Sequence, residues 1–317
     1  MTVFRMSSFS KIFSFTAETL PVVTAFGVSC YALYQFALET VFLERECEKK
    51  AYNGHMKNPF DENTQKIIDE ASSKFVDELS ARQLASIKYY WCNKPSIQVN
   101  GSVQSIAGSY TCIGIPTHFS YKSPAEVDMS VIKDGFNINN IDPVLSEQLK
   151  HSLSLSENAK KFAITSAIHY SNSQHSKLKL DGVLLSLGGF GCGKLIADRF
   201  PGTLERSPAK LLALFVVILV VWTAIHYSIY DIYHKNLQVK CDRLTAESSE
   251  ELYEGGLEYL EKCLQRNQIL LKLVPSLQVF FDQDGNDLGS YITLSQRREL
   301  LIKNKNESDK TENLNNS

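Results

Sequence analysis

Residues 211–230 form an apolar run, LLALFVVILVVWTAIHYSIY, that contains no Asp, Glu, Lys or Arg. About 20 residues are enough for a helix to cross the ~30 Å hydrocarbon core of a bilayer. Nearly every face of this helix would be apolar, which is not typical of a helix on the surface of a soluble domain. Trp222, Tyr227 and Tyr230 gather in its second half, and such rings favour the membrane interface. The pattern predicts a transmembrane helix.

Two weaker runs share this character. Residues 19–38 lie uncharged between Glu18 and Glu39, and residues 180–197 read LDGVLLSLGGFGCGKLIA. Charges near the ends of the second run can reach the membrane surface. The linker 198–210 is too short for a domain, so residues 180–230 are predicted to form a tight hairpin. The chain would then have two or three transmembrane helices.

Gly189 and Gly193 in the first arm of this hairpin are spaced as a small-xxx-small face. Such a face lets two membrane helices approach closely. We therefore expect both glycines to contact the helix 211–230 or a helix of a partner protein.

The N-terminal residues 1–18 are basic and rich in serine, with no acidic residue before Glu18. This composition is typical of a mitochondrial targeting segment, and a short basic tail before a signal anchor is the alternative. Lysine and arginine are similarly dense on both sides of the predicted spans. The positive-inside rule therefore says little about which side the soluble segments face. We expect them to face the matrix.

Residues 39–179 are predicted to be a soluble α/β segment. Apolar residues recur at helical spacing in 61–91, which predicts one long amphipathic helix. The run IQVNGSVQSI then alternates around an Asn-Gly turn, as in a β-hairpin. The next strand, SYTCIGIP, ends at Gly114 and Pro116, so we expect a sheet of three or four strands with both residues at a candidate packing contact.

A helix to about residue 171 is predicted after Ser154-Leu155-Ser156-Glu157, which has the form of a capping box. Beyond the hairpin, residues 231–302 are predicted to contain an amphipathic helix, 245–274, and a final β-hairpin. Gly255 and Gly256 together cost that helix about 1–2 kcal/mol, so we expect a close contact or a break there. The polar tail 303–317 is predicted to be disordered.

These elements indicate an α+β membrane protein. Its soluble domain would mix helices with a small sheet and would be built from segments on both sides of the hairpin. Closing the hairpin would bring the helix ending near residue 171 and the helix 245–274 to the same surface of the membrane.

Composition excludes several classes of function. The 317 residues are 44% hydrophobic and 21% charged, with a net charge of −2, and the mean hydropathy is −0.15. This is too polar for a transporter with many spans, and the charge balance argues against nucleic-acid binding. Seven cysteines occur without a CxxC pair, which is neither a disulfide framework nor a zinc pattern.

No motif points to catalysis or to a cofactor or metal. GGFGCGK at 188–194 resembles a phosphate-binding loop, but Leu195 stands where Ser or Thr is needed. Asp282-x-Asp284-x-Asn286 lacks the glycine and glutamate of a calcium loop. The sequence contains no HExxH and no GxSxG. We therefore expect a protein that is not an enzyme.

Three segments together are similar to the transmembrane protein 177 family: IGIPTHF at 113–119, SLSLSENAKKFAI at 152–164 and GGLEYLEKCL at 255–264. The resemblance covers about residues 20–300. It implies a multi-pass protein of the mitochondrial inner membrane that takes part in cytochrome c oxidase assembly. The implied partners are the bilayer, newly made oxidase subunit 2 and its assembly chaperone, and the implied role is that of a non-catalytic scaffold.

Two alternatives stay open. A helix, a membrane hairpin and a helix with G-G-x-E-x-x-E also resemble membrane zinc peptidases of the HExxH class. Here Ser166 and Tyr170 would replace the two histidines and Ala167 the catalytic glutamate, which would make the site degenerate. The sequons at Asn100, Asn306 and Asn315 would instead allow an endoplasmic-reticulum membrane protein.

Overall fold

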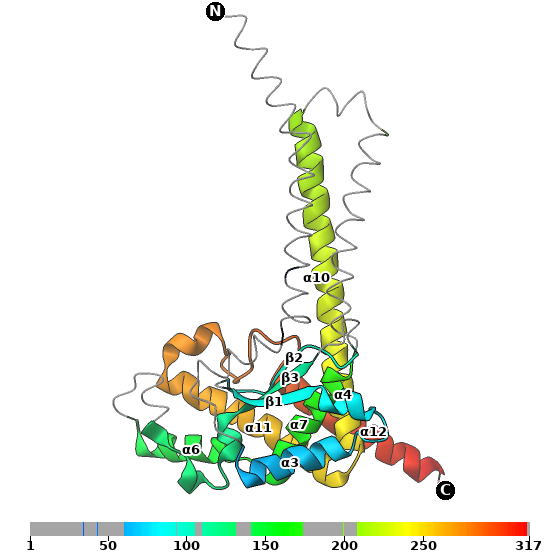
Figure 1. Cartoon of the computed structure of the whole chain (residues 1–317). Helices are drawn as coiled ribbons and strands as arrows, with labels where there is room; N and C mark the ends of the chain where they lie inside the picture. The colour runs from blue at the N-terminus through cyan, green and yellow to red at the C-terminus, as the bar shows by residue number, and fades with distance from the viewer. Residues whose placement is uncertain are drawn as a thin grey trace, which may run out of the picture. The chain divides into compact units, whose positions relative to one another are not determined.

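The computed structural model describes residues 60–92, 94–104, 110–130, 141–173 and 208–315, together with Tyr34, Leu43 and Arg199 (Figure 1). The chain divides into two units. Unit 1 contains Met1–Phe42 and Gln174–Tyr233, and unit 2 contains Leu43–Ser173 and His234–Ser317. Unit 2 mixes helices with a small sheet and joins segments from both sides of residues 174–233. The mixed character expected from the sequence is confirmed.

Helix α10, Pro208–Glu247, includes the apolar run. Within the described residues, one helix is long and apolar enough to cross a membrane, at Val216–Glu247, with a mean hydropathy of 1.5. The predicted span 19–38 and the hairpin arm 180–197 lie outside the described residues, except for Tyr34. The number of transmembrane helices and the hairpin therefore stay predictions.

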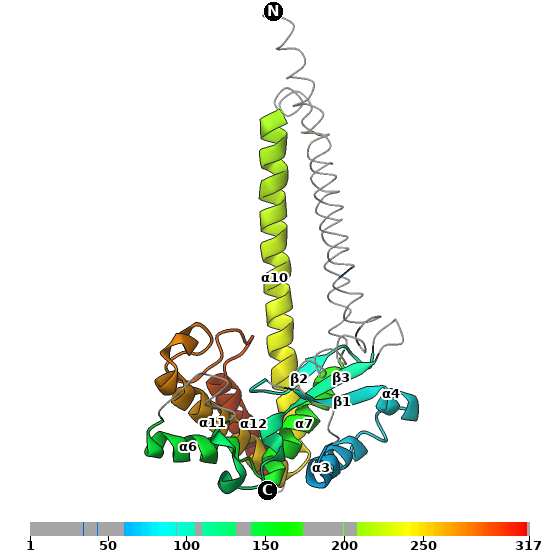
Figure 2. The same cartoon turned by 60° about the vertical axis from the view of Figure 1, so that its left-hand side comes forward.

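The sheet of unit 2 has three strands: β1 Ile87–Cys92, β2 Gln98–Asn100 and β3 Thr111–Pro116 (Figure 2). Their order is β1-β3-β2, with β1 parallel and β2 antiparallel to β3. Every residue of β3 is buried, as expected for the central strand.

The strand pairing predicted around the turn Asn100-Gly101 is wrong. Gly101 does have the positive φ of a turn, 79°, but β2 pairs with β3 and not with the residues after the turn. Those residues are held by the end of a helix instead. Val103 donates its N–H to the carbonyl of Ser171 at 2.9 Å, and the Ser102 hydroxyl donates to Ser173.

The single helix predicted for 61–91 is also wrong. Helix α3, Glu62–Ser73, starts at the N-cap Asp61, and helix α4, Ala81–Ala85, starts at a capping box between Ser80 and Gln83. The turns between the two helices also bury apolar side chains at helical spacing. The apolar period of the sequence therefore continues past the end of α3, although the backbone there is not helical. The aromatic run IKYYWC then forms β1, as its high β-propensity favours.

Helix α6, Pro143–Leu153, precedes helix α7, Glu157–Ser171, and two short 3-10 helices, η1 Thr117–Ser120 and η2 Pro124–Glu126, lie before them. The cap of α7 differs from the predicted capping box. Ser156 is the N-cap, and the acidic partner of its N–H and hydroxyl is Glu258, more than a hundred positions away in the chain. A tertiary contact replaces the local one.

Helix α11, Glu250–Leu273, begins at the N-cap Ser249, so the predicted helix 245–274 is divided near Ser248. The 3-10 helix η3, Pro275–Val279, follows, and a bridge between Phe281 and Asp287 closes a turn.

The last strand of the predicted hairpin, Ser290 to Leu294, does not form, and helix α12, Leu294–Asn315, replaces most of the predicted disordered tail. Tertiary contacts favour the helix. Leu301 is buried, and Lys305 forms an ion pair with Glu250 of α11.

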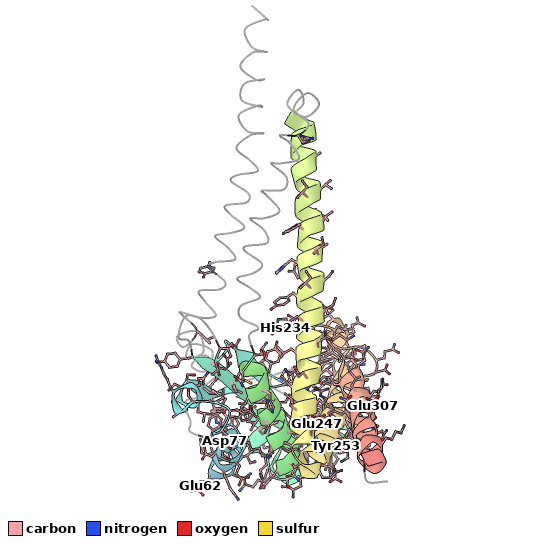
Figure 3. All side chains as sticks on the ribbon, turned by 90° about the vertical axis from the view of Figure 1, so that its right-hand side faces the viewer. Glu62, Asp77, His234, Glu247, Tyr253 and Glu307 are labelled. Carbon is pink, nitrogen blue, oxygen red and sulfur yellow. The ribbon has the colours of Figure 1, made fainter. Side chains whose placement is uncertain are left out.

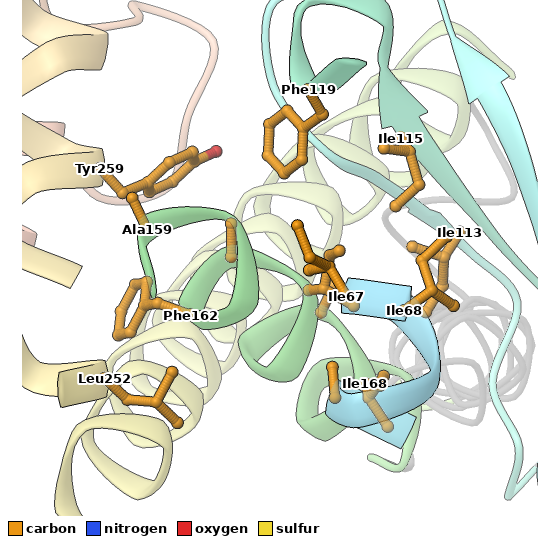
Figure 4. Packing of buried hydrophobic residues seen from close by; sticks show 14 of the residues in the cluster. Ile67, Ile68, Ile113, Ile115, Phe119, Ala159, Phe162, Ile168, Leu252 and Tyr259 are labelled. Atoms are coloured by element: carbon orange, nitrogen blue, oxygen red, sulfur yellow. The ribbon is translucent and has the colours of Figure 1, made fainter. Parts of the chain in front are cut away.

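Helix α7 lies at the centre of the core, where it contacts α3, β3 and α11 (Figure 4). Its side chains Phe162, Ile164 and Ile168 are inaccessible to solvent, as are Ile113 and Ile115 of β3. Burial of side chains of this size stabilises a fold by about 1.5–3 kcal/mol each before the entropy of ordering is subtracted.

Candidate functional site

The contact between α7 and α11 depends on Gly255 and Gly256. A Cβ atom on Gly255 would lie 2.5 Å from the carbonyl carbon and oxygen of Asn158, and one on Gly256 would lie 2.6 Å from the ring of Phe162. Real Cβ atoms do not come this close to their neighbours. Helix α11 continues through both positions, so the pair lies at a close helix contact and not at a break.

Gly114 and Pro116 lie on β3. Gly114 faces the ring of Tyr90 on β1, where an added Cβ would lie 2.9 Å from the ring carbon Cζ. Pro116 pairs with Cys92 at the end of the parallel ladder and precedes η1. Both residues therefore belong to the interior of the sheet. Gly189 and Gly193 lie outside the described residues.

A buried ionic network joins α7, α10 and α12 within unit 2. The carboxylate of Asp242 accepts two hydrogen bonds from the Arg297 guanidinium, from Nε at 2.7 Å and from Nη2 at 2.9 Å. The Ser166 hydroxyl of α7 donates to the same carboxylate at 2.8 Å, and the Gln238 amide donates at 3.2 Å. The Asp242 side chain is only 3% exposed and that of Arg297 is 15% exposed.

The charges of this network neutralise each other. Burial lowers the pKa of Arg297, but the charge and hydrogen bonds of Asp242 outweigh it and raise the pKa above its ordinary value. Tyr259 of α11 is also buried nearby, and burial, together with the neighbouring Cys263, raises the pKa of its phenol. The guanidinium therefore stays charged and the phenol stays neutral, and the network is a fixed ion pair.

Tyr170 and His169 of α7 also contact neighbouring elements. The Tyr170 hydroxyl lies 2.5 Å from Nδ1 of His234 on α10, and the ring of Tyr291 stacks on His234 with centroids 4.7 Å apart. His169 packs edge-on against Phe75, with centroids 4.6 Å apart. Burial, and secondarily the charge of Lys240, lowers the pKa of His169 to about 4. Its imidazole is therefore neutral near pH 7.

The histidines of the described residues do not form a metal site. His118 is buried beside Phe119, and burial, followed by the charges of Arg266 and Lys160, lowers its pKa. Among the residues that the structure describes, no group of three or more His, Cys, Asp or Glu side chains could hold a metal ion. Ser166 and Tyr170, the positions compared with zinc-peptidase histidines, contact Asp242 and His234.

A groove of about 820 Å³ lies between α6 and α11. It combines polar and apolar side chains, and Val144 on its border is 62% exposed. The lining residues are Pro143, Val144, Glu147, Gln148, His151, Gln265, Gln268, Ile269 and Lys272. A hollow between two helices can accept the apolar face of a partner helix. This groove is the best candidate for a binding surface within the described residues.

Sequence reasoning missed both the ionic network and the groove. Asp242 and Arg297 are far apart in the chain, and each reads as an ordinary surface charge in its own helix. A weak signal was available, because Gln238 and Asp242 share one helical face with Thr245. The groove depends on how α6 packs against α11, and no local pattern reports that.

Unit 2 and the apolar part of α10 together define a membrane protein with a mixed α/β unit that contains a buried ion pair between Asp242 and Arg297. The profile of the family Transmembrane protein 177 matches residues 21–317, and the chain belongs to that family. Transmembrane protein 177 of Mus musculus is 28% identical over 163 residues, which cover 51% of this chain and 52% of the mouse protein. The match thus spans about half the length of this curated relative. No solved structure matches the chain.

Proposed function

We propose that this protein is a non-catalytic scaffold of the mitochondrial inner membrane that assists cytochrome c oxidase biogenesis. It would hold newly made subunit 2 together with the assembly chaperone of that subunit. Membership of the transmembrane protein 177 family over residues 21–317 is the observation that carries this proposal. The multi-pass arrangement and the mitochondrial location belong to the proposal.

The chemistry of α7 supports a scaffold better than a hydrolase. A zinc peptidase of the HExxH class needs two imidazoles and a carboxylate on one helix. Here the Ser166 hydroxyl donates to Asp242, and the Tyr170 hydroxyl lies against His234. The side chain of Ala167 is only a methyl group and cannot act as a base. These contacts give the positions a structural role in joining α7 to α10.

The groove between α6 and α11 is the surface that we assign to the partner. Val144 presents an apolar side chain at its border, and Glu147 and Lys272 place charges of both signs around it. An amphipathic helix of the chaperone or of subunit 2 could place apolar side chains in the groove and polar ones at its rim.

The matched variants Val144→Glu and Val76→Glu test this assignment. The two valines are almost equally exposed, at 62% and 61%, but only Val144 lines the groove. Tagged full-length protein is purified from mitochondria in mild detergent, and the recovered chaperone and subunit 2 are quantified. We expect Val144→Glu to lower their recovery roughly tenfold, because a carboxylate must be desolvated in the interface, and Val76→Glu to leave it unchanged.

Different results would contradict different parts of the proposal. Recovery of no oxidase-assembly component by the unmodified protein would refute the function. Equal recovery with both glutamate variants would refute only the groove. Stoichiometric zinc in the purified protein would revive a hydrolase, and a glycosidase-sensitive mobility shift would place the chain in the secretory pathway.

A further inference from the structure

Three apolar side chains near the end of α11 are strongly exposed: Val279, Phe280 and Leu288, at 67%, 58% and 57%. We call them the apolar edge. Phe280 and Leu288 are neighbours across the turn, because the Leu288 N–H donates to the Phe280 carbonyl at 2.8 Å. Contiguous exposed apolar groups of this kind mark a contact surface more often than isolated ones do.

Hydrogen bonds hold the turn that carries the apolar edge against the helices α11 and α12 of unit 2. The Asp282 carboxylate accepts hydrogen bonds from the N–H groups of Asp284 and Asn286, at 2.9 and 2.8 Å. Asn267 of α11 donates to the carbonyl of Gly285 at 2.8 Å, and the Asn286 side chain accepts from the N–H of Ser295 at 2.9 Å. The backbone is therefore bonded on both sides, and the apolar side chains are held outward.

Chain connectivity brings this region close to the bilayer. Tyr291, three residues after Leu288, stacks on His234 at 4.7 Å. His234 follows Tyr230, the last residue of the apolar run, by only four positions. Four residues span ~14 Å at most and ~6 Å as a helix. Wherever residues 211–230 cross the membrane, His234 and Tyr291 lie near its surface.

We propose that the apolar edge inserts into the boundary between the headgroups and acyl chains of the bilayer and gives unit 2 a second membrane contact. A phenylalanine with two aliphatic neighbours has the composition of an interfacial insertion, and Tyr291, three residues after Leu288 in the chain, has the polar tip that favours the same depth. The adjacent carboxylates of Asp282 and Asp284 would be repelled by anionic lipids. The insertion is thus driven by burial of apolar surface, and it needs no anionic headgroup.

Photo-crosslinking of the full chain in phosphatidylcholine nanodiscs tests this proposal. p-Benzoylphenylalanine replaces Phe280 or Leu288, and lipid adducts are measured by mass spectrometry. The positive control carries the same group at Val217, inside the apolar run. The negative control carries it at Glu247, which lies at the other end of the unit 2 part of α10, away from His234 (Figure 3).

We expect lipid adducts at positions 280 and 288 to exceed those at 247 roughly tenfold, since burying one such side chain is worth more than a factor of ten. Addition of cardiolipin should not increase them. Adducts no more frequent than at position 247, while position 217 reacts, would overturn the proposal. Crosslinks to a protein in place of lipid, in whole mitochondrial membranes, would also overturn it and assign the edge to a protein partner.

Discussion

Replacing Gly255 with alanine tests how closely α7 and α11 approach. In an exposed helix this change would stabilise the protein by about 1 kcal/mol, because alanine has the higher helix propensity. Here the new methyl group would lie 2.5 Å from the backbone of Asn158, where ordinary contacts begin at 3.4 Å. A backbone cannot rotate away as a side chain can, so the two helices must separate by roughly 1 Å along a close-packed contact.

Overpacking of this kind costs about 3 kcal/mol, at the upper end of the usual range, because the clash is with backbone. The net expectation for Gly255→Ala is a loss of about 2 kcal/mol in the free energy of unfolding. That corresponds to a Tm lower by about 4–8 °C in a domain of this size. Thermal unfolding of the full chain in detergent, followed by circular dichroism, measures it.

The exposed neighbour Glu254 supplies the control for this prediction. Glu254→Ala adds no atom to the contact and should leave Tm nearly unchanged. If Gly255→Ala is as stable as Glu254→Ala or more stable, the close approach of the two helices is refuted.

Three further predictions concern unit 2. Asp242→Ala leaves the guanidinium of Arg297 without its partner and should cost about 3 kcal/mol of stability; a double replacement, Asp242→Leu with Arg297→Met, should cost less. Glu258→Ala removes the acceptor for Ser156 at the start of α7 and should cost about 1 kcal/mol in chemical unfolding. His169 has a folded-state pKa of about 4, below its ordinary value of 6.5, so its contribution to stability is present above pH 6.5 and is lost as the pH falls toward 4. Between pH 7 and pH 5, the Tm of the His169→Leu variant should therefore fall less than the Tm of the unmodified protein.

Each of these variants has a matched control on the same element or of the same residue type. Asp231→Ala removes an exposed carboxylate of α10, Glu261→Ala removes one of α11 that is 52% exposed, and His151→Leu removes an exposed imidazole. All three should be nearly neutral. If Asp231→Ala costs as much as Asp242→Ala, the buried ion pair is not what stabilises the junction, and an unchanged pH profile in His169→Leu would exclude a role for that imidazole.

Much of the fold could be predicted because its signals are local. The apolar run 211–230 needs no tertiary partner to be recognised, and α10 contains it. The β-rich segments around residues 98–116 form part of a small sheet, and the N-cap of α7, Ser156, lies two residues from the predicted cap. Glycines inside an amphipathic helix are locally unfavourable, so the sequence alone predicts a close contact or a break at Gly255 and Gly256.

Other parts could not be predicted, because a local pattern agreed with more than one structure. Phe75 and Leu79 keep helical spacing after α3, but they are buried from turns, where tertiary packing decides the backbone. The tail after Lys303 has the composition of a disordered segment. It is nevertheless helical to Asn315, because Leu301 is buried and Lys305 pairs with Glu250.

The sequence by itself determined that this chain has a membrane helix, a mixed α/β unit built from two distant segments, and a resemblance to one family. Hydrophobic period, run length and turn residues act over a few positions, and they were sufficient for this. Only the tertiary structure decided that Asp242 pairs with Arg297, that Glu258 accepts hydrogen bonds from the N-cap of α7, and that a groove lies between α6 and α11. These features depend on which helix faces meet, and that choice is made by the packing of the whole core.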